Sequence, residues 1–370
     1  MSCSTSELPP DLTVEILSRL SVKSLVRFKS VCKLWFSLIE SSRFVSRHLN
    51  RSINNCGGDK DRYGCRYLLV KHRRRDSGAR LISLLSTETL ELIPPVDIPP
   101  HVDAREFNVI GSCNGILCCA SDSGWPIFFW NPATRKSRVL PGCMFSRGGV
   151  ELPESLCVFA HGFGYDCVVD DYKLVRIAFF HLLNKPCFRA EVFAVSEGSW
   201  REVPALACRV YSSGCTAVNG ILYWVAYNCG SDDQELILSF NLRDEVFGRV
   251  YMPDSSFIGD GNCTKLSVYQ ESLCLIVYNF RGRSKCLDLW MMSDGARQHC
   301  WTKQLSIGPI IGVHKPLGYG INGEIFMEKN NGTLVIYDAE NEAVQDLPVK
   351  GFPYSLDCHF YIESLVSVGR

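Results

Sequence analysis

The sequence lacks several features that would point to common classes of protein. Its 370 residues contain no run of 18 or more apolar residues, so we expect no membrane-spanning helix. The N-terminus has no basic region followed by an apolar stretch, so we expect no secretion and a location in the cytoplasm, the nucleus or both. The 39 basic and 39 acidic residues cancel, which gives no general attraction to nucleic acid or to membranes.

Motifs for catalysis and for metal binding are lacking as well. The 8 histidines are dispersed, and none lies in a Gly-x-Ser-x-Gly, His-Glu-x-x-His or phosphate-loop context. The 19 cysteines include no Cys-x-x-Cys and no zinc-like spacing with histidine. We therefore expect no catalytic residue, no metal and no cofactor. Without secretion the cysteines should be thiols, and those in strand-like stretches should fill core positions: Cys118, Cys119, Cys157, Cys274 and Cys286.

What the chain does have, near its N-terminus, is three short segments with apolar residues at helical spacing. Leu8-Pro9-Pro10-Asp11 is a helix-entry signal in which Asp11 can act as the cap, and Ser21 can cap the second helix. A segment of about 40 residues seldom supports a core alone, so the leftover apolar face needs the rest of this chain or another protein. The segment is also rich in basic residues, which suits an acidic partner but equally fits solvated helix faces.

These residues resemble an F-box, in order and with its spacing, from Leu8-Pro9 to the Val31-Cys32-Lys33-x-Trp35 element. One departure is Ser21, where the family often has proline. The resemblance implies docking onto a Skp-type adaptor, and through it onto the cullin and RING subunits of a ubiquitin ligase. The adaptor-contact positions that the resemblance implies are Leu8, Pro9, Leu12, Ile16, Leu17, Leu20, Leu25, Val31, Cys32, Lys33 and Trp35.

After a polar, glycine-bearing stretch over residues 51–65, interpreted as a linker, a strand-turn-strand pattern recurs six times. Tight turns such as Asn114-Gly115 and Asn219-Gly220 precede short apolar strands, and later strands close on Leu-Pro or a similar pair. The repetition predicts a β-propeller of about six blades, with seven possible, rather than a β-sandwich. A terminal strand from Phe360 to Val366 should complete the first blade and close the ring.

Three motifs in this region resemble plant F-box-associated domains, which are kelch-like propellers that follow an F-box. They are residues 111–117, residues 130–135 and residues 162–175. The chain is similar both to S-locus F-box proteins and to defence-related F-box/kelch proteins. The expected fold is therefore multidomain, α plus all-β: a three-helix F-box module at 1–50, a linker at 51–65 and a kelch-like propeller at 66–370.

Several residues in the expected propeller allow two interpretations. Asp166, Asp170 and Asp171 are more typical of turns than of a calcium site, because the spacing lacks the glycine and terminal glutamate of an EF-hand loop. The run from Lys71 to Arg75 fits a solvated hairpin tip better than a nuclear-import or nucleic-acid signal. The repeated tryptophans should pack between blades, with carbohydrate stacking as the alternative: Trp130, Trp200, Trp224, Trp290 and Trp301.

Together these patterns predict a non-catalytic substrate-recognition subunit of an SCF-type ubiquitin ligase. Its partners would be a Skp-type adaptor, cullin and RING subunits and a target protein of unknown identity, without nucleic acid or membrane. Variable propeller loops should select the target, at residues 142–156, 205–216, 227–234 and 254–263. Two alternatives remain: an F-box propeller scaffold acting outside a ligase, and a carbohydrate-binding or oxidative kelch propeller that the helices merely cap.

Overall fold

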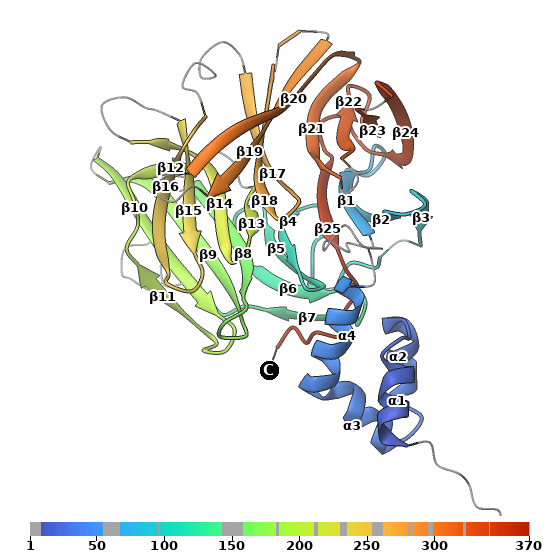
Figure 1. Cartoon of the computed structure of the whole chain (residues 1–370). Coiled ribbons are helices and arrows are strands. Elements are labelled where there is room, and N and C mark those ends of the chain that lie inside the picture. The colour runs from blue at the N-terminus through green and yellow to red at the C-terminus, as the bar shows by residue number, and fades with distance from the viewer. Residues whose placement is uncertain are drawn as a thin grey trace, which may run out of the picture.

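Four helices precede a ring of β-sheets in this computed structural model (Figure 1). The structure describes residues 9–54, 67–94, 96–142, 158–182, 185–210, 214–229, 235–253, 262–279, 281–282, 284–294, 299–320, 323–339 and 341–369. The helices are α1 (Pro10–Leu17), α2 (Val22–Phe28), α3 (Lys33–Glu40) and α4 (Ser42–Asn54). No helix within these ranges is long and apolar enough to cross a membrane.

The strands of the described residues form six antiparallel sheets, which are the blades of a propeller. Blade 1 contains β25 (Asp357–Tyr361), β1 (Tyr67–Arg73), β2 (Arg80–Ser86) and β3 (Leu92–Ile93). Blade 2 contains β4 (Phe107–Cys113), β5 (Ile116–Ser121), β6 (Ile127–Asn131) and β7 (Lys136–Val139). Blade 3 contains β8 (Val158–Asp166), β9 (Asp171–Leu182), β10 (Lys185–Ala194) and β11 (Ser199–Val203).

The other three blades continue the same order around the ring. Blade 4 contains β12 (Cys208–Val210), β13 (Thr216–Val218), β14 (Ile221–Asn228), β15 (Glu235–Asn241) and β16 (Val246–Tyr251). Blade 5 contains β17 (Asn262–Tyr269), β18 (Ser272–Asn279), β19 (Ser284–Asp294) and β20 (His299–Ile311). Blade 6 contains β21 (Val313–Tyr319), β22 (Ile325–Lys329), β23 (Thr333–Asp338) and β24 (Ala343–Lys350). The predicted six-bladed propeller is confirmed.

The hydrophobic core of the ring lies between blades rather than at its centre. Each blade packs both faces against its neighbours, so a middle strand such as β6 buries every one of its residues. Blade 1 closes the ring, because β25 pairs with β1 from the other end of the chain, with Tyr361 opposite Tyr67. Closure pairs the edge of β1 that an open ring would leave free, so that the blades keep only the short edges of their end strands. The closing strand ends at Tyr361, however, so the expected strand through Val366 is wrong beyond that residue.

The tight turns follow the chemistry of their residues. Asn114 and Gly115 have φ values of 50° and 82°, and Asn219 and Gly220 have 49° and 76°. Positive φ at both central positions is what a type I′ hairpin turn requires, and Asn-Gly adopts it at little cost.

Three tryptophans tie neighbouring blades together, as predicted. The indole Nε1 of Trp200 donates to the carbonyl of Pro141, that of Trp224 to His161 and that of Trp301 to Tyr251. In each pair the donor and acceptor belong to adjacent blades. Trp130 is buried at 1% exposure, while Trp290 is only half-buried. These rings therefore hold the blade interfaces.

Two sequence-based expectations need correction. Lys71 and His72 lie inside β1, where the Lys71 ammonium donates to Asn108 Oδ1 at 2.7 Å and the His72 side chain is buried. The run from Lys71 to Arg75 is therefore not a solvated hairpin tip, which begins only at Arg74. Among the cysteines, Cys118, Cys119 and Cys274 are buried as expected, but Cys286 is exposed and Cys157 lies outside the described residues.

Candidate functional site

The helical module has a small core of its own. Leu17, Val22 and Leu25 from the first two helices pack against Ile39 of α3 and Phe44 of α4. The fourth helix was not expected, and it continues to Asn54, so residues 51–54 are helical rather than part of the linker. The rest of the expected linker lies outside the described residues.

Side-chain caps position the second and third helices. Ser21 accepts a hydrogen bond from the amide of Ser24, as the sequence suggested for a family position that is often proline. The Cys32 sulfur accepts from the amide of Trp35 at the start of α3. Asp11 does not cap α1, because the helix begins at Pro10. Asp11 instead lies in its first turn, where a negative charge complements the helix dipole.

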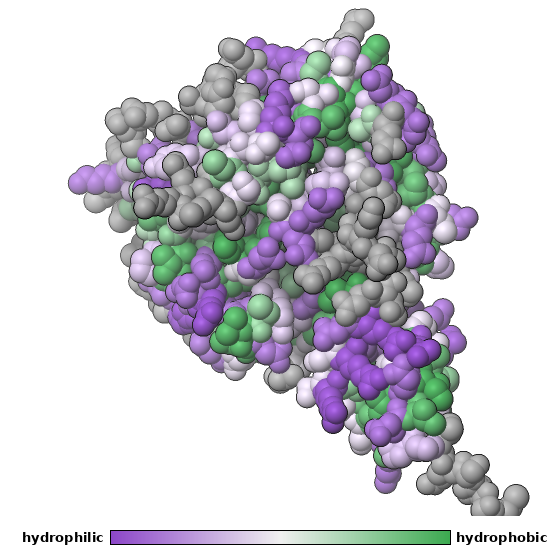
Figure 2. All heavy atoms as spheres, in the orientation of Figure 1, coloured by the Kyte–Doolittle hydropathy of each residue, from purple (hydrophilic) through white to green (hydrophobic). Residues whose placement is uncertain are grey.

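A set of apolar side chains on this module remains exposed. Their exposed fractions range from 37% to 74%, although large apolar residues normally lie inside. Figure 2 shows hydrophobic residues gathered over α1 and α2, whereas hydrophilic residues cover α4. We define the apolar surface of the module as Leu12, Ile16, Val26, Val31, Leu34 and Phe36.

The expected adaptor-contact residues divide into three groups in the structure. Leu17 and Leu25 are only 2% and 0% exposed, so they hold the helices together and do not reach the surface. Leu20 and Trp35 are half-buried, and the Trp35 ring packs against Phe28 with centroids 5.4 Å apart. Leu8 lies outside the described residues. The exposed members of the expected set are Pro9, Leu12, Ile16, Val31, Cys32 and Lys33.

Three exposed residues of this surface were missing from the expected set: Val26, Leu34 and Phe36. Leu34 is the most exposed of them, at 74%. Val26 and Leu34 recur at helical spacing with other apolar residues of their segments, but spacing alone does not tell whether such a stripe faces the core or a partner. Phe36 does not belong to the apolar stripe of α3. An aromatic residue on the otherwise polar side of a short helix is a signal of a partner site, and it could have identified Phe36.

Arginines from two helices converge on one carboxylate beside this surface. Glu15 of α1 forms ion pairs with Arg19 at 2.7 Å and with Arg51 of α4 at 2.9 Å, and it also pairs with Arg47. The hydrogen bonds from Arg19 and Arg51 lower the pKa of Glu15 to about 2. This cluster of ion pairs connects α4 to α1.

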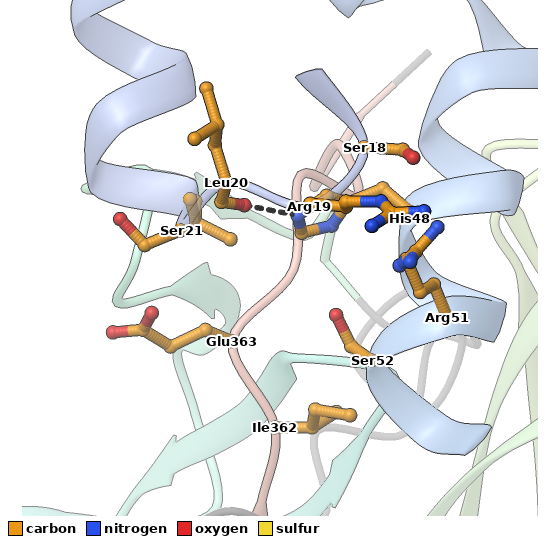
Figure 3. Close-up of a pocket in the computed structure, with 10 residues that line it drawn as sticks. Ser18, Arg19, Leu20, Ser21, His48, Arg51, Ser52, Ile362 and Glu363 are labelled. Atoms are coloured by element: carbon orange, nitrogen blue, oxygen red, sulfur yellow. Dashed lines mark hydrogen bonds between the residues drawn. The ribbon is translucent and has the colours of Figure 1, made fainter. Parts of the chain in front are cut away.

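A cavity of about 300 Å³ lies where the module meets the end of the chain (Figure 3). Residues 18–22 form one wall, and His48, Arg51 and Ser52 of α4 form another. Ile362 and Glu363 close it from the propeller side. The His48 imidazole bonds the carbonyl of Leu20 at 2.9 Å, which holds the two walls together. The cavity therefore marks an interface between helices and ring, separate from the exposed apolar surface.

Comparison with known proteins finds a family match for the helical module and another for the propeller. The F-box associated beta propeller domain family matches residues 82–367, and the F-box domain matches residues 5–47. The chain belongs to the F-box associated beta propeller family. It is similar to an F-box/kelch-repeat protein of Arabidopsis thaliana, at 26% identity over 98% of this chain and 96% of that protein. It is also similar to the F-box protein CPR1 of Arabidopsis thaliana, at 27% identity over 97% of this chain and 88% of that protein.

The aspartates of this F-box associated propeller have structural partners. Asp166 pairs with the Lys173 ammonium at 3.3 Å, and the same ammonium reaches Glu245 of blade 4 at 3.0 Å. Asp171 accepts bonds from the Ser196 amide and hydroxyl, and Asp170 accepts from the Tyr165 hydroxyl at 2.6 Å. No group of three metal-ligating side chains occurs among the described residues. These contacts favour the turn interpretation over a calcium site.

One face of the ring carries the helical module, and the loops that follow the outer strands lie on the opposite face. The chain alternates direction from strand to strand, so the outer strand of each blade ends on the face opposite to the helices. Of the loops expected to select a target, residues 143–156, 211–213, 230–234 and 254–261 lie outside the described residues. Nearby on that face, Ile311, Phe352 and Tyr354 are 79%, 49% and 58% exposed. His314 packs against Tyr354 with ring centroids 4.0 Å apart.

Proposed function

We propose that this chain is the substrate-recognition subunit of an SCF-type ubiquitin ligase. The helical module would bind a Skp-type adaptor through its exposed apolar surface, and the propeller would hold a target on its opposite face. The observation that carries the proposal is the exposure of Leu12, Val31 and Leu34 on a module with so small a core. Such a surface is typical of a partner site.

The mechanism that we propose is proximity. The chain makes and breaks no bonds itself. It holds a target near a ubiquitin-charged enzyme, and this raises the effective concentration of the target lysines around that enzyme. The exposed basic residues Lys23, Arg27 and Lys33 of the module support an acidic adaptor, because complementary charge raises the rate of encounter.

The test compares two valines of equal exposure. Val31 on the module is 60% exposed, and Val168 in the β8–β9 turn of the ring is 59% exposed. We expect Val31→Asp, combined with Leu34→Asp, to weaken capture of a plant Skp-type adaptor by about a hundredfold, because charges replace two apolar contacts. Val168→Asp should leave capture unchanged. The measurement is calorimetric titration of the purified full chain with adaptor, with circular dichroism as a folding check.

Retained capture by the Val31/Leu34 variant would reject the apolar surface as the adaptor site. Adaptor capture without recruitment of cullin would instead favour a scaffold outside a ligase. A full chain that ignores the adaptor but binds glycan or copper would favour the remaining alternative, in which the helices only cap the propeller.

A further inference from the structure

Residues 362–369 follow the closing strand β25 and leave the ring on the face that carries the helices. We call this segment the strap. It is not a strand, yet much of it is buried: Ser364 is 0% exposed, and Leu365 and Val368 are each 6% exposed. Buried backbone groups in an irregular segment need hydrogen-bond partners, so the surroundings of the strap must supply some of them.

The strap carries apolar side chains into two separate cores. Leu365 packs into the core of the helical module with Leu17, Leu25 and Ile39. Val368 packs instead into the core between blades 2 and 3. Adjacent parts of one short segment therefore belong to the helices and to the ring.

Asn131, at the end of β6, holds the strap in place. Its side chain is 0% exposed, and its amide nitrogen donates to the carbonyls of Ser364 at 3.0 Å and Val366 at 2.8 Å. Its carbonyl oxygen accepts from the amide of Thr134 at 3.2 Å. The amide thus uses both N–H groups on the strap while its oxygen closes the turn.

The Asn114-Gly115 turn provides the second attachment. The Ser364 hydroxyl donates to the Asn114 carbonyl at 2.6 Å. A Cβ atom on Gly115 would lie 2.3 Å from Ser364 Oγ and 2.7 Å from the Ile362 carbonyl oxygen. Glycine is therefore required here for its positive φ and also for the close approach of the strap.

We propose that the strap fixes the helical module on the ring, and that Asn131 is the positioning residue that holds it. Residues 55–66 connect α4 to β1 along the chain, and the strap adds a non-covalent connection beside the direct contacts that Ala133 and Lys136 of blade 2 make with the module. The consequence, which rests on the proposed function, is a constant distance from adaptor to target. Ubiquitin transfer benefits from that constancy because reach and orientation are set before the target binds.

A matched pair of asparagines tests the proposal. Asn241 caps the equivalent turn of blade 4, where its oxygen accepts from the amides of Arg243 and Asp244 and its nitrogen donates to Asp244 within the turn. In both positions Asn→Asp keeps the shape and the accepting oxygen. Only Asn131→Asp removes two donors to the strap and turns a carboxylate oxygen toward its carbonyls.

The measurement is amide hydrogen exchange of the full chain, without adaptor, followed by mass spectrometry. We expect Asn131→Asp to speed exchange about tenfold or more in residues 362–369 and in α1 to α3, while Asn241→Asp leaves both unchanged. If Asn131→Asp speeds exchange in the strap but not in the helices, the strap does not hold the module and the proposal is wrong. Unchanged exchange in both regions would also overturn it.

A milder variant guards against general unfolding. Leu365→Ala leaves Asn131 and the ring untouched, and we expect it to speed exchange in the helices while the blades keep their protection. Equal loss of protection in the blades would contradict the proposal. Adaptor capture by the wild-type chain is measured separately, so its failure would reject the proposed function and leave the exchange result standing.

Discussion

The helical module and the propeller treat apolar side chains in opposite ways. The ring buries the apolar side chains of its middle strands in six interfaces between blades, where residues such as Leu117, Trp224 and Leu275 are fully buried, and exposed ones such as Ile311 lie at strand ends and in turns. The module leaves Val31, Leu34 and others more than half exposed. The ring can bury both faces of every sheet because each blade has two neighbours. The module has a neighbour on one side only, so its remaining apolar surface requires another molecule.

The largest effect that we expect is a loss of stability when a buried side chain between two blades of the ring is removed. Trp224 is 0% exposed and bonds across to blade 3, so Trp224→Ala should lower the free energy of unfolding by about 3–5 kcal/mol. Urea unfolding, followed by tryptophan fluorescence and circular dichroism, measures the loss. Trp290→Ala, at a half-buried position, is the control and should cost clearly less. Equal losses would mean that burial between blades is not what stabilises the ring.

A smaller effect is the pH dependence of stability, to which the ring and the helical module contribute at different pH. His161 is buried beside Arg176, and burial together with that positive charge lowers its pKa to about 3. The unfolded chain binds a proton below about pH 6.5 while the folded chain does not, so stability is full above that pH and decreases on acidification toward pH 3. The loss attributable to His161 is at most about 1.4 kcal/mol per pH unit.

Urea unfolding at pH 7.5 and pH 5.5 tests this prediction. His161→Gln should remove that part of the pH dependence, whereas His101→Gln, at an exposed position, should retain it. The contribution of Glu15 in the module should appear at lower pH. Its Glu15 carboxylate has a lowered pKa, so the stability that it contributes is present above pH 4.5 and is lost as the pH falls toward 2. An unchanged pH slope in His161→Gln would contradict the prediction.

The smallest effect leaves stability unchanged and maps the apolar surface. Cys32 is exposed at the start of α3, whereas burial raises the pKa of Cys274 in blade 5 to about 12. Iodoacetamide at pH 8 should therefore modify Cys32 and spare Cys274. Addition of adaptor should protect Cys32, while the exposed Cys286 on the ring stays reactive. Peptide mass spectrometry measures both, and equal reactivity of Cys32 with and without adaptor would place the adaptor elsewhere.

Much of this fold could be predicted because its signals are local. Apolar spacing located three of the helices, and Asn-Gly turns such as Asn219-Gly220 located the hairpins of the blades. Six repetitions of one pattern were enough to count the blades. The fourth helix was not predicted, although Phe44, Val45, Leu49 and Ile53 of α4 recur at helical spacing among mostly polar residues, so an available signal was missed.

The candidate site was only partly predictable, because it depends on contacts between distant parts of the chain. Whether Leu17 or Leu34 faces the core is decided by α3, α4 and the strap, and none of these is encoded in the spacing of a single helix. The strap itself looks like a strand, since apolar residues recur from Ile362 to Val368. It is held by Asn131, more than 230 positions earlier in the chain, and a turn residue gives no sign of so distant a partner.

Ring closure has a consequence for the order in which the protein is made. The ribosome synthesises the helices first, but the core of the module is complete only after Leu365 has been synthesised. Blade 1 is likewise complete only after β25 has been synthesised. Both parts must therefore remain unfinished while five blades emerge, with unpaired edges and apolar surface open to chaperones. A premature stop codon after residue 356 would remove β25 and the strap together. Its product would fail in both halves at once, even though every residue of the F-box would be present.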